Sequence, residues 1–208
     1  MNDIFEWNGP IYRFLAKIVD LFVLNAVFLI SCLPIVTMGS SITAMYSITM
    51  KMVRNEDVSI IKGFIDSFKK NFKQSTIIWM IVLAVGVILS LDYYFLNLYT
   101  GSLSLLVKLS LIIFTFAYLL LFTFIFPYVA RFENSIKNSI INTWKIAFLH
   151  PIKTFTVLIF TTMIPVITFV FSIYSFLFLL YFCMFIGFSL IAYVNTIVIR
   201  SIYERYEN

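Results

Sequence analysis

The chain has 208 residues, of which 62% are hydrophobic and only 12% are charged. A soluble domain is about half apolar and about a quarter charged, so this composition excludes an ordinary soluble protein and indicates a membrane protein. The formal net charge of +5 does not indicate nucleic-acid binding, because the basic residues gather at the ends of apolar runs, where the positive-inside rule places them.

The runs 75–91, 109–130 and 154–199 contain no charged residue. A transmembrane helix needs about 20 mainly apolar residues, so the last run is long enough for two helices, and we expect a turn at 171–175. The sequence thus predicts an all-α fold, a polytopic membrane helical bundle of about six transmembrane helices in three hairpins. The predicted spans are 19–35, 39–53, 76–97, 103–128, 155–171 and 176–199.

The basic residues form islands before the first span, between spans and after the last span. Their members are Arg13 and Lys17; Lys51, Arg54, Lys62, Lys69, Lys70 and Lys73; Arg131, Lys137, Lys145 and Lys153; and Arg200 and Arg205, while Lys108 lies outside them. By the positive-inside rule, this distribution predicts a multi-pass protein of the cell membrane with both termini and both internal islands in the cytoplasm.

Two islands have the periodicity of amphipathic helices, with an apolar stripe opposite a basic one: 61–73 and 136–148. We expect both segments to be cytoplasmic interfacial helices that lie in the membrane plane. Each precedes an apolar hairpin. The pattern favours a single integral membrane domain, 1–208, with repeat units at 1–55, 56–130 and 131–208.

The segment 32–39, Cys-Leu-Pro-Ile-Val-Thr-Met-Gly, joins the first two predicted spans with no charge and with both common helix breakers. If the first helix begins at Val19, Pro34 lies only about 22 Å along it, which is less than the roughly 30 Å hydrocarbon thickness. The turn is then re-entrant, whereas a start near Phe14 makes it an ordinary outer loop. Broken helices build transporter sites, but they also serve packing alone.

The candidate structural or functional motif is Cys32, Pro34, Thr37, Gly39 and Thr43. Gly39, Thr43 and Ser47 recur at helical spacing, and small residues in such a stripe let two helix backbones approach closely. We therefore expect the second span to be the most enclosed helix of the bundle.

Polar residues inside the predicted spans are the other candidates: Asn25, Asp92 and Asn195. No carboxylate lies at a predicted midplane, which argues against a proton-relay pump. For the two asparagines we expect hydrogen bonds between helices.

Chemistry-bearing motifs are otherwise missing from the sequence. The single histidine, His150, excludes an HExxH zinc motif, and there is no nucleophile elbow, P-loop or dinucleotide fingerprint. The two cysteines, Cys32 and Cys183, have no CxxC spacing. We expect no enzymatic activity, no cofactor and no metal.

The motif at 32–39, followed by Thr43-Ala44-Met45-Tyr46, the basic stretch 51–54 and the segment 69–74 ahead of Trp79, resembles the YesL-like family of bacterial membrane proteins, whose function is uncharacterised. Met38 and the serine pair 40–41 depart from the usual small or aliphatic choices. Members of that family accompany carbohydrate ABC-transport systems, so the resemblance implies a role beside such a system.

Three functions follow from these observations. The first is a non-enzymatic accessory or regulatory component associated with carbohydrate (ABC-type) uptake, which contacts a membrane transporter or another membrane protein through its cytoplasmic helices. The second is a small-molecule permease with a path beside the broken first hairpin, lined by Asn25, Thr37, Thr43 or Asn195. The third is a scaffold whose basic faces hold anionic lipid headgroups. A permease predicts a polar cavity at the membrane middle, whereas an accessory protein predicts a packed interior.

Overall fold

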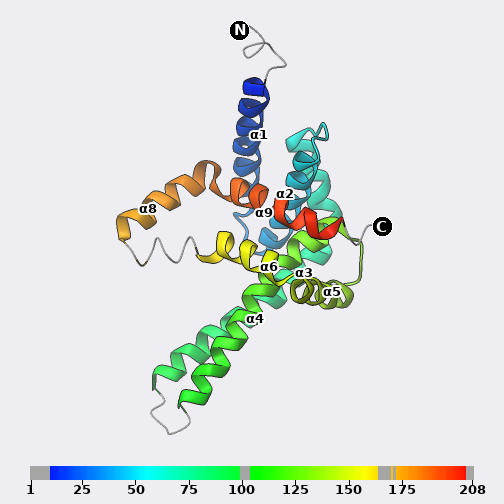
Figure 1. The fold of residues 1–208 in the computed structure, drawn as a ribbon. Coiled ribbons are helices and arrows are strands. Elements are labelled where there is room, and N and C mark those ends of the chain that lie inside the picture. The colour runs from blue at the N-terminus through cyan, green and yellow to red at the C-terminus, as the bar shows by residue number, and fades with distance from the viewer. Residues whose placement is uncertain (1–9, 99–103, 164–169, 171, 205–208) are drawn as a thin grey trace.

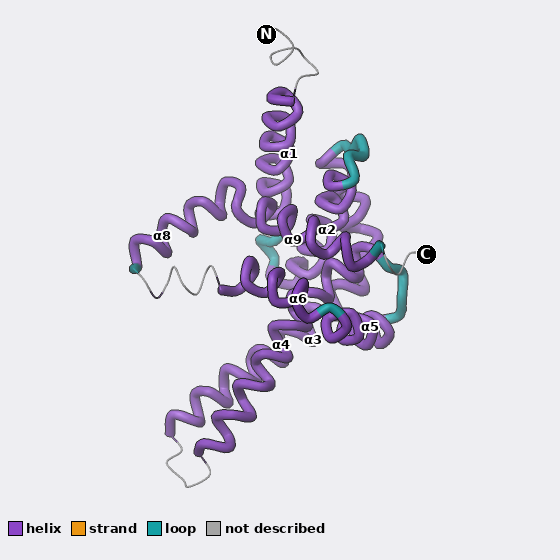
Figure 2. Tube along the Cα trace, viewed as in Figure 1, coloured by secondary structure: helices purple, strands orange, loops and turns teal. Residues whose placement is uncertain are grey.

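The computed structural model describes residues 10–98, 104–163, 170 and 172–204, and the regular elements of this part of the chain are all helical (Figures 1 and 2). The all-α expectation is confirmed. The α-helices are α1 (Pro10–Ser31), α2 (Met38–Val53), α3 (Ile60–Leu98), α4 (Ser104–Arg131), α5 (Ile136–Leu149), α6 (Pro151–Leu158), α8 (Ile173–Phe182) and α9 (Phe188–Tyr203). A 3₁₀ turn, η1 (Ile35–Thr37), precedes α2, and two π-helical segments, η2 (Ile159–Met163) and η3 (Cys183–Gly187), follow α6 and α8.

Within the described residues, 4 helices are long and apolar enough to cross a membrane: Ile11–Ser31, Ile60–Leu96, Ser104–Arg131 and Ile173–Tyr203, the last running through η3. Helix α2, with 16 residues, is about 24 Å long, less than a hydrocarbon core of roughly 30 Å. The predicted fifth span reaches into 164–169 and 171, which lie outside the described residues. Six spans in three hairpins therefore stay a prediction.

Helix α1 begins at Pro10, nine residues before the expected start at Val19. A proline is tolerated in the first turn of a helix, where its missing N–H has no intrahelical partner to lose. The 22 residues of α1 extend about 33 Å, enough to cross the hydrocarbon core. Of the two starts that the sequence left open, the structure therefore favours the earlier one over Val19, and the turn at Pro34 is not preceded by a short helix.

Helix α2 is the enclosed centre of the bundle, as the stripe of small residues predicted. Most of its residues from Gly39 to Met52 are buried, and the others are partly buried. It packs against α1, α3, α4 and α9, so the interior of the molecule is built around it.

Gly39 sets the distance between α2 and α3. A methyl group placed on its Cα would lie 2.5 Å from both the Ser75 carbonyl oxygen and Trp79 Cβ, and 3.2 Å from the Phe126 ring. The Ser75 carbonyl oxygen is part of the α3 backbone and Trp79 Cβ is attached directly to it, so neither atom can move away without moving the helix. Only glycine therefore permits this close approach of α2 to α3. Further along the same pair of helices, a methyl group on Gly63 would meet Ile48 Cδ1 at 2.9 Å. Helix α2 therefore runs antiparallel to α3 along the latter's charged first half.

Helix α3 is one continuous helix of 39 residues, about 58 Å in length. The amphipathic segment 61–73 is its first half and runs straight into the apolar second half. The expectation of a separate helix in the membrane plane was therefore wrong here, because the sequence from 60 to 98 contains no proline that would end the helix. Phe64 is buried in the core, whereas Ile61 and Ile65 are exposed.

Helix α5 matches the second amphipathic segment and is a separate element. Ser135 caps its start by accepting a hydrogen bond of 3.3 Å from the Asn138 N–H, and His150 ends it just before Pro151. Ser139, Thr143 and Ile146 face the protein, whereas Phe148 and Leu149 are exposed. The placement of α5 in the membrane plane stays a prediction.

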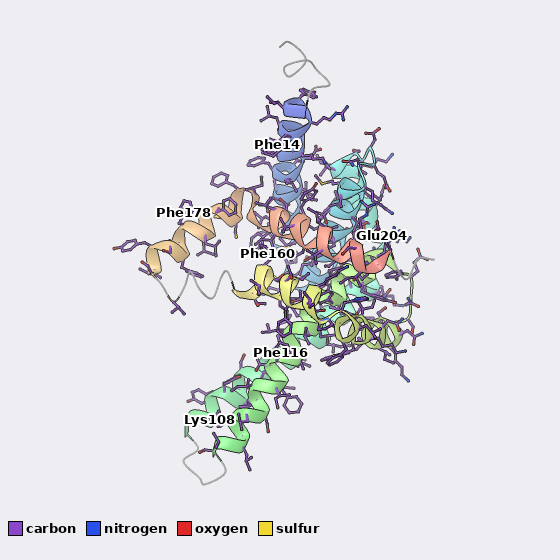
Figure 3. The ribbon with its side chains drawn as sticks, viewed as in Figure 1. Phe14, Lys108, Phe116, Phe160, Phe178 and Glu204 are labelled. Carbon is purple, nitrogen blue, oxygen red and sulfur yellow. The ribbon has the colours of Figure 1, made fainter. Side chains whose placement is uncertain are left out.

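The far ends of α3 and α4 project from the rest of the molecule as a paired arm, and α8 projects as a second arm (Figure 1). Figure 3 labels Phe116 on the first arm and Phe178 on the second. Both arms expose large apolar side chains, among them Ile113 at 67% and Phe178 at 74%. Apolar surface this extensive is not tolerated in water, so these arms belong in a lipid bilayer.

We predict that Gly39→Ala destabilises the protein by about 2 kcal/mol or more, because the added methyl overpacks a backbone contact. Thermal unfolding of the detergent-solubilised protein measures the loss. Gly86→Ala is the matched control: its methyl would meet the terminal hydroxyl of Tyr118 at 2.8 Å, a side-chain end that can move, while alanine favours the helix by about 0.5–1 kcal/mol. Equal stability of both variants would contradict the close approach at Gly39.

Candidate functional site

The turn between α1 and α2 is held by its own polar groups. The Thr37 hydroxyl lies 2.6 Å from the Ser31 carbonyl oxygen and 2.8 Å from that of Pro34, and it donates between them. Trp79 of α3 donates from Nε1 to the Ile35 carbonyl oxygen at 2.8 Å. These side chains donate hydrogen bonds to carbonyl oxygens of the turn, which lipid cannot do. The bond from Trp79 also anchors the turn to the middle of α3. Pro34 is exposed, and Cys32 is half-buried.

Behind the turn, a seam of hydroxyls joins α2 to α3. Thr43 Oγ1 lies 2.9 Å from Ser75 Oγ, and Ser40 Oγ lies 3.1 Å from Thr76 Oγ1. Thr43 also donates to its own helix at the Gly39 carbonyl, 2.9 Å away. Of the predicted motif residues, Gly39 and Thr43 are therefore brought together in one helix–helix contact, whereas Thr37 serves the turn.

Asn25 of α1 fits into the π-helical segment η3. A π-helix shifts the hydrogen-bond register, and the carbonyl oxygens of Cys183 and Met184 accept from Asn25 Nδ2 at 3.0 and 2.9 Å. The Ser189 N–H donates to Asn25 Oδ1 at 3.1 Å. One fully buried amide thus completes the backbone bonding of the α8–α9 helix, which confirms the expected interhelical role.

Asn195 of α9 lies in a second buried polar cluster. Its Nδ2 donates to Thr161 Oγ1 at 2.8 Å and reaches Tyr46 Oη at 3.5 Å. Beside this cluster, the hydroxyl oxygens of Thr49 and Thr196 lie 2.9 Å apart and join α2 to α9. Asn195 Oδ1 has no hydrogen-bond partner among the described residues. Asn195 therefore also bonds between helices, as the sequence predicted.

Asp92 belongs to neither cluster. It is exposed near the far end of α3, where Tyr93 Oη pairs with Thr115 Oγ1 of α4 at 2.9 Å. The predicted site residues are thus divided among the turn, the α2–α3 seam, the η3 junction, the α9 cluster and this far end. They do not form one pocket.

The charged end of the bundle, by contrast, brings the basic islands together. Lys17 of α1 donates to Asn55 Oδ1 at 3.0 Å, Arg200 of α9 donates to the Val53 carbonyl oxygen at 3.1 Å, and Lys153 reaches Ser201 Oγ at 2.8 Å. Islands that are far apart in sequence therefore share one end of the molecule. Lys108 lies at the opposite end, as its label and that of Glu204 show in Figure 3.

The turn between α2 and α3 shapes this end. Asn55 has a left-handed backbone, with φ of 55°, a conformation that asparagine tolerates better than most residues. The Glu56 N–H bonds to the Lys51 carbonyl at 3.1 Å and the Asn55 N–H to that of Met52 at 3.1 Å, the bonding of a Schellman cap. The cap leaves the Asn55 side chain free to receive Lys17.

Lys70 of α3 forms an ion pair with Glu133, just after α4. The hydrogen bond and the charge of Lys70 lower the pKa of the Glu133 carboxyl. Any stability from this pair is therefore present above the usual glutamate pKa and is lost as pH falls through the lowered value. Because the pair is exposed, solvent screens it and its contribution is small.

Four cavities lined by described residues open at the charged end. The largest, of about 800 Å³, lies between α1 and the α2–α3 turn and is lined by Arg13, Lys17, Asp20, Asn55 and Glu56 among others. Two further ones, of about 310 and 460 Å³, flank Lys70 and Glu133, and a small one of about 30 Å³ lies at Arg200. None of these four is lined by Asn25, Thr43 or Asn195. No group of three or more His, Cys, Asp or Glu side chains suited to a metal occurs within the described ranges.

Sequence reasoning missed the buried partners Tyr46, Thr49 and Thr196, and the convergence of Arg54, Arg131 and Arg200. Polar residues in apolar helices were the available signal for the first group, but their pairing depends on tertiary contacts. The arginines end three different helices, and nothing local links them.

Comparison with known protein families adds one finding. Residues 21–93 match a family described as a protein of unknown function, DUF624. The chain is similar to that family over the segment that holds the second half of α1, the turn, α2 and most of α3. No curated protein and no solved structure matches the chain.

We predict that Asn25→Leu destabilises the protein by about 2 kcal/mol or more, because it leaves buried carbonyls and a buried N–H without partners. Unfolding in detergent measures the loss. Asn138→Leu, at an exposed position of α5, is the control and should change stability by less than about 0.5 kcal/mol. An Asn25→Leu variant as stable as the parent would show that η3 does not depend on this amide.

Proposed function

We propose that the protein is a non-enzymatic accessory or regulatory component of the cell membrane, associated with an ABC-type carbohydrate uptake system. Its working surface is the charged end, where the basic islands, α5 and the first half of α3 meet. The observation that carries the proposal is that buried polar groups of the described helices bond to one another, whereas the four cavities lined by described residues open at the charged end. A protein that acts on a partner needs an accessible surface, whereas a permease needs an open polar interior.

The link to carbohydrate uptake rests on the resemblance to YesL-like proteins. The motif at 32–39 and the segment up to Trp79, which carry that resemblance, lie within the residues 21–93 that match the family of unknown function. The absence of an enzymatic role is part of the proposal and rests on the absence of catalytic motifs in the sequence. We also propose the three repeat units on sequence grounds.

The proposed orientation places the charged end, and with it both termini, in the cytoplasm. The support is the contact of Lys17 with Asn55 and of Arg200 with Val53, which holds the start of α1 and the end of α9 at the same end. Lysine and arginine concentrate on the cytoplasmic side of membrane proteins.

We infer that the first hairpin does not cross the bilayer completely. Trp79 binds the turn at Ile35, and α3 continues from Trp79 to Leu98, a further length of about 29 Å. The turn thus lies well short of the far end of α3. In this arrangement α2 is an enclosed helix of the charged end rather than a lipid-facing span.

The alternative function is a small-molecule permease with a path beside the first hairpin. The observation in its favour is the exposed break at Leu33 to Val36, next to the hydroxyl seam of α2 and α3. Against it, Thr43 and Asn25 are fully buried and bonded to neighbouring helices.

Co-purification from native membranes tests the accessory role. We predict that the tagged full-length protein retains a transporter subunit, and that a double variant, Lys62→Glu with Lys69→Glu, loses it, because both side chains are exposed on the charged half of α3. Lys108→Glu, at the opposite end, is the matched control and should retain the subunit. Consistent absence of any transporter subunit would refute the proposal.

Proteoliposomes containing only this protein separate the two functions. The accessory role predicts no uptake of labelled sugar above that of empty liposomes. Saturable uptake by the protein alone would instead establish the permease.

A further inference from the structure

The first half of α1 has one charged face, and that face is turned toward the protein. Arg13, Lys17 and Asp20 are spaced by four and three residues, so they lie on one side of the helix. With the turn between α2 and α3, they line the largest of the four cavities, of about 800 Å³. The start of α1 and this turn lie at the same end of the molecule (Figure 1). We call this cavity the α1 cleft.

The opposite face of the same part of α1 is apolar and exposed. Phe14 is 64% exposed and Leu15 54%, and Ile11 and Ile18 are exposed as well. A helix on the surface of a soluble protein has the reverse arrangement, with its apolar stripe facing inward. The outer face of this part of α1 therefore lies against lipid, and the charged face is sheltered from lipid by the cleft.

Asp20 lies deeper in the bilayer than the lipid headgroups. It follows Ile11 by nine residues, a rise of about 14 Å along the helix. One headgroup layer is only about 5–8 Å thick, half the difference between the whole bilayer and its hydrocarbon core. Because Ile11 already exposes apolar surface to lipid, Asp20 is at hydrocarbon depth. Ionisable residues at this depth face a partner or a polar cavity, and they mark functional sites.

Two positive and two negative side chains of the cleft have no charged partner among the described residues: Arg13, Lys17, Asp20 and Asp57. Lys17 donates to the neutral amide of Asn55, and the other three side chains form no hydrogen bond or ion pair with the part of the chain that the structure describes. Glu56 also lines the cleft, but its Oε1 lies 2.8 Å from Arg54 Nε, so its charge is neutralised.

Uncompensated charges of both signs in one cleft suit a zwitterion. Arginine and lysine are the side chains that bind phosphate oxygens, and a carboxylate accepts hydrogen bonds from an ammonium group. A volume of about 800 Å³ falls within the range of about 300–1,000 Å³ that is typical of small-ligand pockets. The cleft therefore matches a group that carries a phosphate beside an ammonium.

The surroundings of the cleft favour a membrane lipid as the source of that group. Apolar residues are exposed on the outer face of α1, and Ile61 and Ile65 are exposed on α3 just beyond Ile60, which lines the cleft. A phospholipid places its headgroup in the cleft and its acyl chains against this apolar surface, whereas a soluble zwitterion makes no use of the surface. A primary ammonium has three N–H donors for the carboxylates, and a quaternary ammonium has none.

We propose that the α1 cleft binds the headgroup of phosphatidylethanolamine. Arg13 and Lys17 hold the phosphate, and Asp20 and Asp57 hold the ammonium. This site goes beyond the proposed function and does not depend on a role in uptake.

Native mass spectrometry of the detergent-solubilised full-length protein tests the site, with separate titrations of phosphatidylethanolamine, phosphatidylglycerol, phosphatidylcholine and phosphoethanolamine. We expect phosphatidylethanolamine to bind saturably and at least about ten-fold tighter than the other two lipids, which lack an ammonium N–H, because a hydrogen bond between charged groups is lost. Equal binding of phosphatidylethanolamine and phosphatidylglycerol would overturn the proposal. Displacement of the lipid by phosphoethanolamine at similar concentration would assign the site to a soluble ligand and refute the lipid.

Asp57→Asn is the decisive variant, because Asp57 is exposed in the turn and its replacement leaves the helices intact. It should weaken phosphatidylethanolamine binding about ten-fold and leave phosphatidylglycerol binding unchanged or tighter, so that the preference is lost. Asp20→Asn should do the same, whereas Arg13→Gln should weaken the binding of both lipids. Asp92→Asn, exposed near the far end of α3, is the matched control and should keep the preference. A preference that persists in both Asp20→Asn and Asp57→Asn would overturn the proposal.

Discussion

The close approach of α2 to α3 at Gly39 is the contact on which the rest of the structure depends. Because no side chain separates the two backbones there, the hydroxyls of Ser40 and Thr43 reach partners on α3. The same approach brings Trp79 within hydrogen-bond distance of the Ile35 carbonyl, which fixes the turn. An enclosed α2 then becomes the surface against which α1, α4 and α9 pack.

A second constraint follows from the bilayer, which offers no hydrogen bonds to polar groups. In the interior, polar side chains form hydrogen bonds with backbone groups that have no other partner, most clearly where Asn25 bonds to η3. The hydrogen bonds of these polar residues hold the helices together. The proposed function therefore lies at the charged end, where ion pairs and cavities are found.

The helical class, the enclosed position of α2, the break before Ile173 and the separate helix α5 were predictable, because each has a local signal in composition, periodicity or capping. The continuity of α3 was not, since an amphipathic stripe shows which face is apolar but not whether the helix stops. Of the candidate residues, the bonding roles of Asn25 and Asn195 were expected from their type. The π-helical partner of Asn25 and the meeting of Arg54, Arg131 and Arg200 arise only from tertiary packing.

The central claim is that the charged end faces the cytoplasm and the α3–α4 arm points away from it. Labelling of intact cells with a membrane-impermeant maleimide tests it most directly, in a parent chain carrying Cys32→Ser and Cys183→Ala. The account predicts that a Lys108→Cys variant is labelled from outside, whereas Lys137→Cys is labelled only after the membrane is opened. Labelling of Lys137→Cys in intact cells, with Lys108→Cys protected, would contradict it.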